Sequence, residues 1–126
     1  AEQRILDLFE KALPRISEFE ATFKAALRLS LEQAAQDGPT GEQPRFTRGH
    51  RRELLNDALA PLRGQLPDED LDRLAQALSL IFGVEVYTVL KDIWDLSDIQ
   101  SSKVAKWAAC ALVRSAIAET GAREVT

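Results

Sequence analysis

Hydrophobic residues recur along this chain with a helical period, and no stretch shows the alternation typical of a β-strand. The pattern predicts an all-α, five-helix bundle with helices over residues 2–13, 18–36, 48–65, 68–95 and 98–119, and a loop over residues 37–46. Pro14 is expected to end the first helix, because proline cannot donate the hydrogen bond of a helix interior. Pro61 is expected to kink the third helix or to start a second segment of it.

Two capping boxes mark expected helix starts. Ser17 is followed three residues later by Glu20, and Ser97 by Gln100, the spacing at which side chain and backbone cap each other. The loop sequence QDGPTGEQPRF holds two glycines and two prolines, which favour turns over helix. The helix before it still needs partners for its apolar face, so we place residues 1–126 in a single domain.

The segment LSLIFGVEVYTVLKDIW, residues 78–94, is the most apolar part of the chain and carries a carboxylate near its middle. One face of its helical projection contains Phe82, Glu85 and Val89. A second face is also largely apolar and contains Gly83, Tyr87, Leu90 and Trp94. A helix that is apolar on two sides has to be buried on two sides.

The last predicted helix has the same property and is rich in alanine, which lets another helix approach closely. Two neighbouring helices with more apolar surface than one small domain can cover predict a homodimer. Two helices from each chain would then form a four-helix bundle. The residues expected at this interface are Tyr87, Leu90, Trp94, Val104, Trp107, Ala111 and Leu112.

Composition narrows the classes of function. Hydrophobic residues make up 45% and charged residues 29% of the chain, as in ordinary globular proteins. The net charge of −4 is unfavourable for binding nucleic acid, whose phosphates require a basic surface. A single cysteine excludes an internal disulfide, and neither a signal peptide nor a membrane span is recognisable, so we expect a cytoplasmic protein.

Residues suited to catalysis or metal binding are scarce. His50 is the only histidine, and Cys110 lies in an alanine-rich helix where a buried, inert thiol is expected. The sequence contains neither a Glu-x-x-His pair for a di-metal site nor a glycine pattern that cradles phosphate. We therefore expect no enzymatic activity, no metal and no cofactor.

Basic residues are concentrated at one point, in Arg45, Arg48, His50, Arg51 and Arg52. These side chains could contact an anion, or they could form a solvated junction between loop and helix. We favour the junction, because no aromatic residues are interleaved with the basic ones and the chain as a whole is acidic. A third alternative is that one arginine turns inward to meet a buried carboxylate.

Residues 48–116 resemble the C-terminal half of a TetR/AcrR-type transcriptional regulator. The resemblance lies in the order of short motifs: RGxRR at 48–52, LAPLRGQL at 59–66, GxE at 83–85, VLKD at 89–92 and KWAxxALV at 106–113. Upstream, the sequence FEATFKAALRLSLE at 19–32 is similar to the central helix of the same regulators. The resemblance therefore covers nearly the whole chain.

The resemblance implies an effector-sensing and dimerisation domain. In this family a helix-turn-helix module at the N-terminus reads DNA, and we expect that the present sequence is a piece of a longer protein and lacks that module. The family's last two long helices form the homodimer. Its pocket for a small, largely apolar ligand lies among the central helices, and the corresponding candidates here are Phe19, Phe23, Leu27, Leu55, Leu59, Phe82, Glu85 and Val89.

Glu85 stands apart among these candidates, because an unpaired carboxylate is costly to bury. The residue could anchor a ligand in an apolar pocket, pair with Arg51 or Arg52, or lie at the rim of the dimer interface. A different function for the whole chain also remains open, namely a helical dimerisation or protein-interaction module that binds no ligand.

Overall fold

The computed structural model describes the backbone of residues 2–37 and 51–125, and the side chains of residues 2–32 and 51–121. This part of the chain is helical and contains no β-strand, which confirms the all-α prediction. Its helices are α1 (Glu2–Glu18), α2 (Glu20–Asp37), α3 (Arg51–Ala58), the short 3₁₀ helix η2 (Ala60–Leu62), α4 (Asp68–Ser79), α5 (Val84–Asp92) and α6 (Asp98–Val125). Of the loop predicted over residues 37–46, Asp37 ends α2, and the rest lies outside the described residues, as do residues 47–50.

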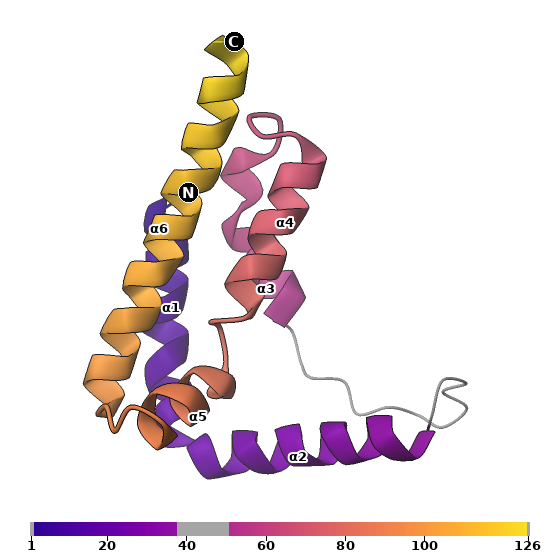
Figure 1. Ribbon diagram of the computed structural model, residues 1–126, viewed down its shortest axis with the longest axis vertical. Helices are drawn as coiled ribbons and strands as arrows, with labels where there is room; N and C mark the ends of the chain where they lie inside the picture. Colours follow the sequence, from indigo (N-terminus) through magenta and orange to yellow (C-terminus); the bar gives the residue numbers. More distant parts are fainter. Residues whose placement is uncertain (1, 38–50, 126) are drawn as a thin grey trace.

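The hydrophobic core lies where α1 packs along α6 and where α3 and α4 close over them (Figure 1). On α6 the core positions are mostly small, with Ala105, Ala109 and Ala116 buried beside Val113. Small side chains allow α1 to approach α6 closely. Across the core, the rings of Phe9 and Phe82 meet with centroids 5.2 Å apart, an aromatic pair that joins α1 to the segment between α4 and α5.

The helix predicted over residues 68–95 is broken, and the prediction of one continuous helix was wrong. Helix α4 ends at Ser79, α5 begins at Val84, and their axes are inclined by 51°. The break centres on Gly83, whose φ of +154° is a conformation that residues with a side chain rarely adopt. The most apolar segment of the sequence is therefore a corner, which places its two halves against different neighbours.

Other helix ends also differ from the prediction, and α5 ends at Asp92 rather than at residue 95. Helix α1 continues through Pro14 to Glu18, because a proline removes one backbone hydrogen bond and burial of Leu13 and Ile16 on either side of it compensates for that loss. Helix α6 runs past Gly121 to Val125. At Pro61 the alternative of a separate segment holds, since α3 ends at Ala58 and the proline lies within η2.

Helix α2 turns away from the bundle and projects beyond it (Figure 1). Its first half contacts α1 and α5, and Leu27 packs against the core. Phe19 and Phe23 were predicted to line a pocket among the central helices, but both are substantially exposed. That prediction was wrong because the face they share has no helix opposite it in the part of the chain that the structure describes.

Candidate functional site

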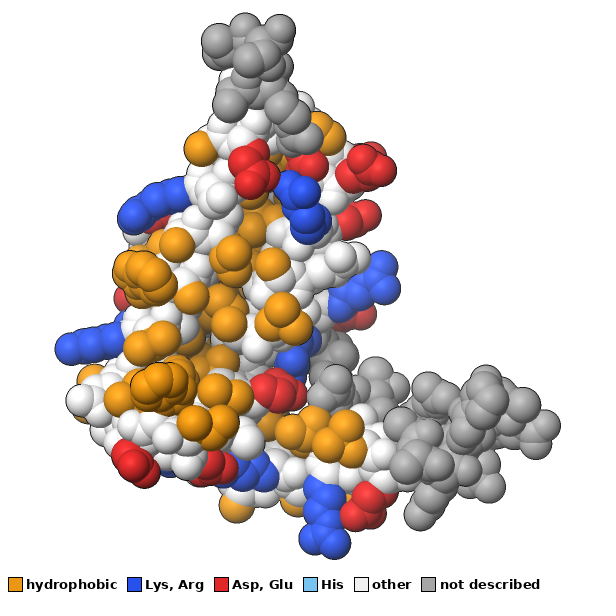
Figure 2. All heavy atoms as spheres, in the orientation of Figure 1, with side chains coloured by type: hydrophobic (Ala, Val, Ile, Leu, Met, Phe, Trp, Pro, Cys, Tyr) orange, Lys and Arg blue, Asp and Glu red, His pale blue; other side chains and the backbone are white. Residues whose placement is uncertain are grey.

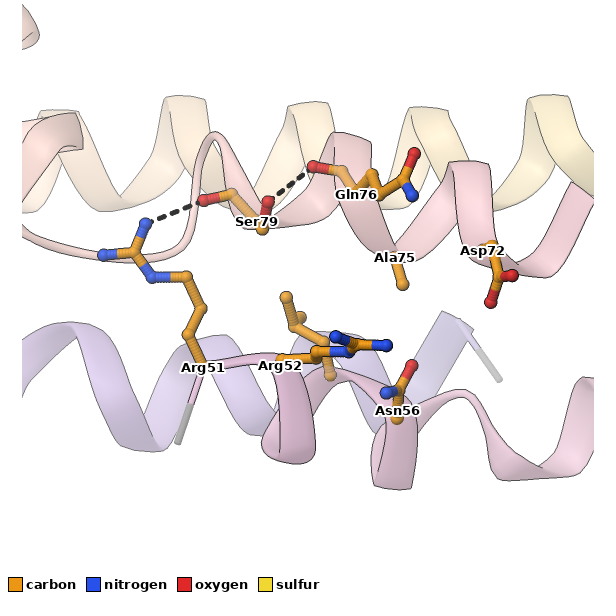
Figure 3. Close-up of a pocket in the computed structure, with 8 residues that line it drawn as sticks. Arg51, Arg52, Asn56, Asp72, Ala75, Gln76 and Ser79 are labelled. Atoms are coloured by element: carbon orange, nitrogen blue, oxygen red, sulfur yellow. Dashed lines mark hydrogen bonds between the residues drawn. The ribbon is translucent and has the colours of Figure 1, made fainter. Parts of the chain in front are cut away.

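A groove of about 460 Å³ runs between α3 and α4 (Figure 3). Helix α3 contributes two arginines and an amide, and helix α4 contributes a carboxylate, an amide and a hydroxyl. Apolar side chains from both helices complete the walls. The lining residues are Arg51, Arg52, Leu55, Asn56, Asp72, Ala75, Gln76 and Ser79.

Arg51 closes one end of this groove by holding the corner between α4 and α5. Its Nη1 donates a hydrogen bond of 3.0 Å to the backbone carbonyl of Ser79, the last residue of α4 (Figure 3). Its Nη2 lies 2.9 and 3.1 Å from the two carboxylate oxygens of Glu85, in the first turn of α5. One guanidinium therefore links the N-terminus of α3 to the helices on both sides of the break. We call this arrangement the Arg51 clasp.

Gly83 is required for the Arg51 clasp. A Cβ added at this residue would collide with the Arg51 guanidinium and would lie 2.7 Å from Oε2 of Glu85, too close for real atoms. The glycine thus provides both the unusual backbone of the corner and the space in which the ion pair forms. Among the alternatives left open for Glu85, the structure shows the ion pair with Arg51.

The predicted pocket residues do not line this groove together, and of the eight only Leu55 does so. Leu55, Leu59 and Phe82 are buried members of the packed core. Val89 was predicted to share the buried face of its helix but is exposed, because the break at Gly83 rotates α5 relative to α4. Glu85 does not line the groove but contacts Arg51, which does.

Exposed hydrophobic side chains gather over α5 and along α6 (Figure 2). On α6 the residues Val104, Trp107 and Ala111 are exposed and recur at three and four positions, on the side opposite the buried alanines. We call these three residues the α6 outer face. Trp107 has 74% of its surface exposed, and Trp94, just after α5, has 67%. Two tryptophans this exposed are typical of a surface that a partner covers.

The predicted dimer residues divide into three groups. Trp94, Val104, Trp107 and Ala111 are exposed and available to a second copy. Leu90 and Leu112 are partly buried against the domain's own core. Tyr87 is fully buried, with its hydroxyl donating to the carbonyl of Leu13 at 2.9 Å, so it cannot lie on a surface and the prediction for it is corrected.

A charged cluster missed by the sequence reasoning connects α1, α2, α5 and α6. Nζ of Lys91 lies 2.7 Å from a carboxylate oxygen of Glu20 and 2.8 Å from one of Asp98. Asp98 also accepts a hydrogen bond from the hydroxyl of Ser17, and Glu20 pairs with Lys24 at 2.9 Å. No local pattern could reveal this cluster, since Glu20 and Lys91 are 71 residues apart in the sequence.

The cluster shifts the ionisation of its members. Hydrogen bonding to Lys91, reinforced by Lys24, holds the pKa of Glu20 below its ordinary value. Lys91 and then Ser17 do the same for the pKa of Asp98. The two carboxylates in turn raise the pKa of Lys91 well above that of a free lysine.

These shifts predict an acid-sensitive fold. A carboxyl whose pKa is lowered on folding contributes stability above its unfolded pKa and loses it as the pH falls through its folded pKa. That loss begins below about pH 4.5 for Glu20 and below about pH 3.8 for Asp98, and unfolding there takes up as many as about two additional protons. Replacement of Lys91 by glutamine should flatten the dependence of unfolding free energy on pH between about 2 and 5. An unchanged slope in K91Q, measured beside the exposed control K11Q, would show that the cluster does not form.

The remaining candidate groups of the sequence are the metal-ligating side chains, the thiol of Cys110 and the basic cluster around His50. Among the described residues no three His, Cys, Asp or Glu side chains converge as metal ligands would. Cys110 is partly exposed, and burial raises the pKa of its thiol, which disfavours the reactive thiolate. Residues Arg45, Arg48 and His50 of the basic cluster lie outside the described residues.

Sequence reasoning did not select the other polar residues of the groove. In the sequence alone, these residues belong to helix faces that are expected to be solvated. They are Asn56 on α3, and Asp72, Gln76 and Ser79 on α4. The available signal was the spacing of the α4 residues by four and three positions, which places them on one side of the helix. That spacing could not show that α3 packs beside the same face and creates a groove.

Comparisons of the chain with models of protein families, with curated proteins and with solved structures find no match. Within the described residues, no single helix combines the length and apolar character needed to cross a membrane.

Proposed function

We propose that this chain is the dimerisation and effector-sensing domain of a TetR-like transcriptional regulator. The observation that carries the proposal is the α6 outer face, an apolar helix surface with an exposed tryptophan at its centre. The order of motifs along residues 48–116 supports the same assignment. In the intact, cytoplasmic protein, an N-terminal module outside this sequence would bind operator DNA, as a repressor or as an activator.

The α6 outer face has the properties of a helix-helix interface. A tryptophan buries about 150–250 Å² when covered, and aromatic residues dominate the energetics of protein interfaces. On the partner, the alanine at 111 and the small side chains beside it leave room for that ring. Exposed Ile93 and Trp94, just after α5, extend the same kind of surface. Two copies pairing through α6, with α5 alongside, would form a four-helix interface.

Effector sensing is proposed for the groove between α3 and α4. Its volume of about 460 Å³ lies in the range of small-molecule sites. The Arg51 clasp connects this groove to α5, and α5 packs on α6. A ligand that favours one arrangement of the clasp would therefore favour one arrangement of the dimer and of the DNA-reading modules attached to it.

Substitution of Trp107 by glutamate tests the dimer. The wild-type chain is expected to have the mass of two copies in solution, and W107E should dissociate about 30-fold more readily, because the variant places a charge where a central aromatic side chain was buried. Sedimentation equilibrium over a range of concentrations measures both. The matched control is I99E, since Ile99 is as exposed as Trp107, at 71%, but lies on another side of α6.

We expect wild type and I99E to form dimers of similar stability, and W107E to form a weaker dimer. A wild-type chain that stays monomeric at high concentration would contradict the proposal. A dimer that I99E weakens as much as W107E does would contradict the interface while leaving dimerisation in place.

A second candidate function is a dimerisation module that senses no ligand. It is favoured by the position of the predicted pocket residues, because Leu55, Leu59 and Phe82 are packed in the core and Phe19, Phe23 and Val89 are exposed. In that case apolar compounds would fail to raise the melting temperature in a thermal-shift screen, while the dimer would still form.

A further inference from the structure

We propose that the groove between α3 and α4 binds a small molecule bearing one carboxylate. Arg52 binds that carboxylate, and Arg51 gives up its ion pair with Glu85 to bind it as well. This inference deepens the effector-sensing half of the proposed function and rests on it.

The charges of the groove select an anionic ligand. Arg51 and Arg52 both belong to the α3 wall, and Figure 3 shows the Arg52 side chain lying along the groove toward Asn56. No ion pair or hydrogen bond of Arg52 is seen among the described residues, in contrast to Arg51. A guanidinium binds a carboxylate through two parallel hydrogen bonds, and the amides of Asn56 and Gln76 can bind the rest of a polar ligand.

The opposite wall limits the charge of that ligand. Asp72 on α4 faces the groove and would repel a multiply charged anion such as phosphate. Leu55 and Ala75 provide an apolar patch between the arginines and Asp72. A planar carboxylate on a small apolar body fits these walls better than phosphate or a cation does.

Arg51 couples this site to the corner between α4 and α5. Its side chain lines the groove and at the same time holds the Ser79 carbonyl and the Glu85 carboxylate. A ligand carboxylate competes with Glu85 for the same guanidinium. When Arg51 turns toward the ligand, both groups lose that contact, and the corner that Gly83 makes is held less firmly. The change thus reaches α5 and, through it, α6.

The test is a titration of the ¹⁵N-labelled wild-type chain followed by backbone amide shifts. Benzoate is the probe, and benzamide is its uncharged counterpart of the same shape. Inorganic phosphate is the second anion. Benzoate should cause saturable shifts at the amides of Arg52, Asn56 and Gln76, and also at Gly83 and Glu85, which report on the Arg51 clasp. Benzamide and phosphate should bind about tenfold more weakly or not at all.

Two variants and a control sharpen the result. R52A should weaken benzoate binding about tenfold or more, whereas R15A, which removes an exposed arginine of α1 away from the groove, should leave it unchanged. E85Q should tighten binding, because the neutral amide competes less well for Arg51. A merely structural role for Glu85 would instead weaken binding together with the fold.

The inference is overturned if wild type shows no saturable shifts, if benzamide or phosphate matches benzoate, or if the shifts map outside the groove. These outcomes need no variant, so a poorly folded R52A cannot obscure them. The solution mass of the same samples separates this inference from the proposed dimer. If the chain is a dimer that does not bind benzoate, the carboxylate site is contradicted and the proposed dimer is not. If the chain is a monomer that binds benzoate, the dimer is contradicted and the carboxylate site is not.

Discussion

Substitution of Gly83 by alanine is expected to lower the free energy of unfolding by about 3 kcal/mol. The φ of +154° at this residue is one that a side chain disfavours, and an added Cβ would also push the Arg51 guanidinium away from Glu85. The Arg51 clasp and the corner between α4 and α5 are then both disturbed. Urea denaturation at a fixed protein concentration measures the change, because the stability of a dimer depends on concentration.

Two other glycines provide graded controls for this prediction. Gly64 has a φ of +84° but no atom within 4 Å of an added Cβ, so G64A should cost only the backbone strain of about 1 kcal/mol. Gly121 lies within α6 with open space around it, and G121A should stabilise the chain by up to about 1 kcal/mol. An effect of G83A no greater than that of G64A would argue against crowding by the clasp.

Substitution of Phe9 by alanine is expected to cost about 4 kcal/mol, the range for removing a fully buried aromatic ring. Phe9 is 0% exposed and packs against Phe82, so the variant leaves a cavity at the contact between α1 and the segment that joins α4 to α5. The same denaturation experiment measures this loss. In the absence of denaturant, the far-UV circular dichroism spectrum of F9A should still be that of a helical protein, because the helices of the remaining core persist.

F23A is the matched control for F9A, since it removes the same ring from α2. Phe23 is 41% exposed on the projecting helix, and its removal should cost less than about 1 kcal/mol. Equal costs for F9A and F23A would mean that α2 packs inward, as the hydrophobic pattern predicted and the structure does not show.

The helical pattern was sufficient to predict the fold class and much of the core. Leu55, Leu59 and Leu62 recur at helical spacing before the turn, and Leu74 and Leu78 recur after it, and all five are buried. The start of α6 also agrees with its capping box, in which the Ser97 hydroxyl and the Gln100 side chain each bond the other residue's backbone. These features depend on residues close together in the sequence.

Features that depend on distant residues could not be predicted in the same way. The corner at Gly83 depends on Arg51, which comes 32 residues earlier in the sequence. Tyr87 was assigned to a surface by its helical projection, but the projection assumed a helix unbroken at 80–83. A carbonyl of α1 receives its hydroxyl in the interior instead. Periodicity fixes which residues share a face and leaves open which neighbour covers that face.

The candidate site illustrates the same limit. The sequence singled out Glu85 and offered Arg51 as one of two partners, and the structure shows that ion pair. The groove beside this ion pair combines residues of α3 and α4. In the sequence alone, the polar face of each of these helices is expected to be solvated. Only the packing of these two helices brings the two arginines of α3 and Asp72 of α4 to the same groove.

The most direct test of the proposed dimer is an isotope-filtered NOE experiment on a mixture of labelled and unlabelled chains. The proposal predicts intermolecular NOEs from the indole ring of Trp107 to alanine methyl groups of the partner's α6, with Ala111 among them. Only contacts between two copies produce such signals, so the measurement reports the interface itself rather than the mass. Intermolecular NOEs that involve α2 or α4 but omit the α6 outer face, or no intermolecular NOEs at millimolar concentration, would contradict the account.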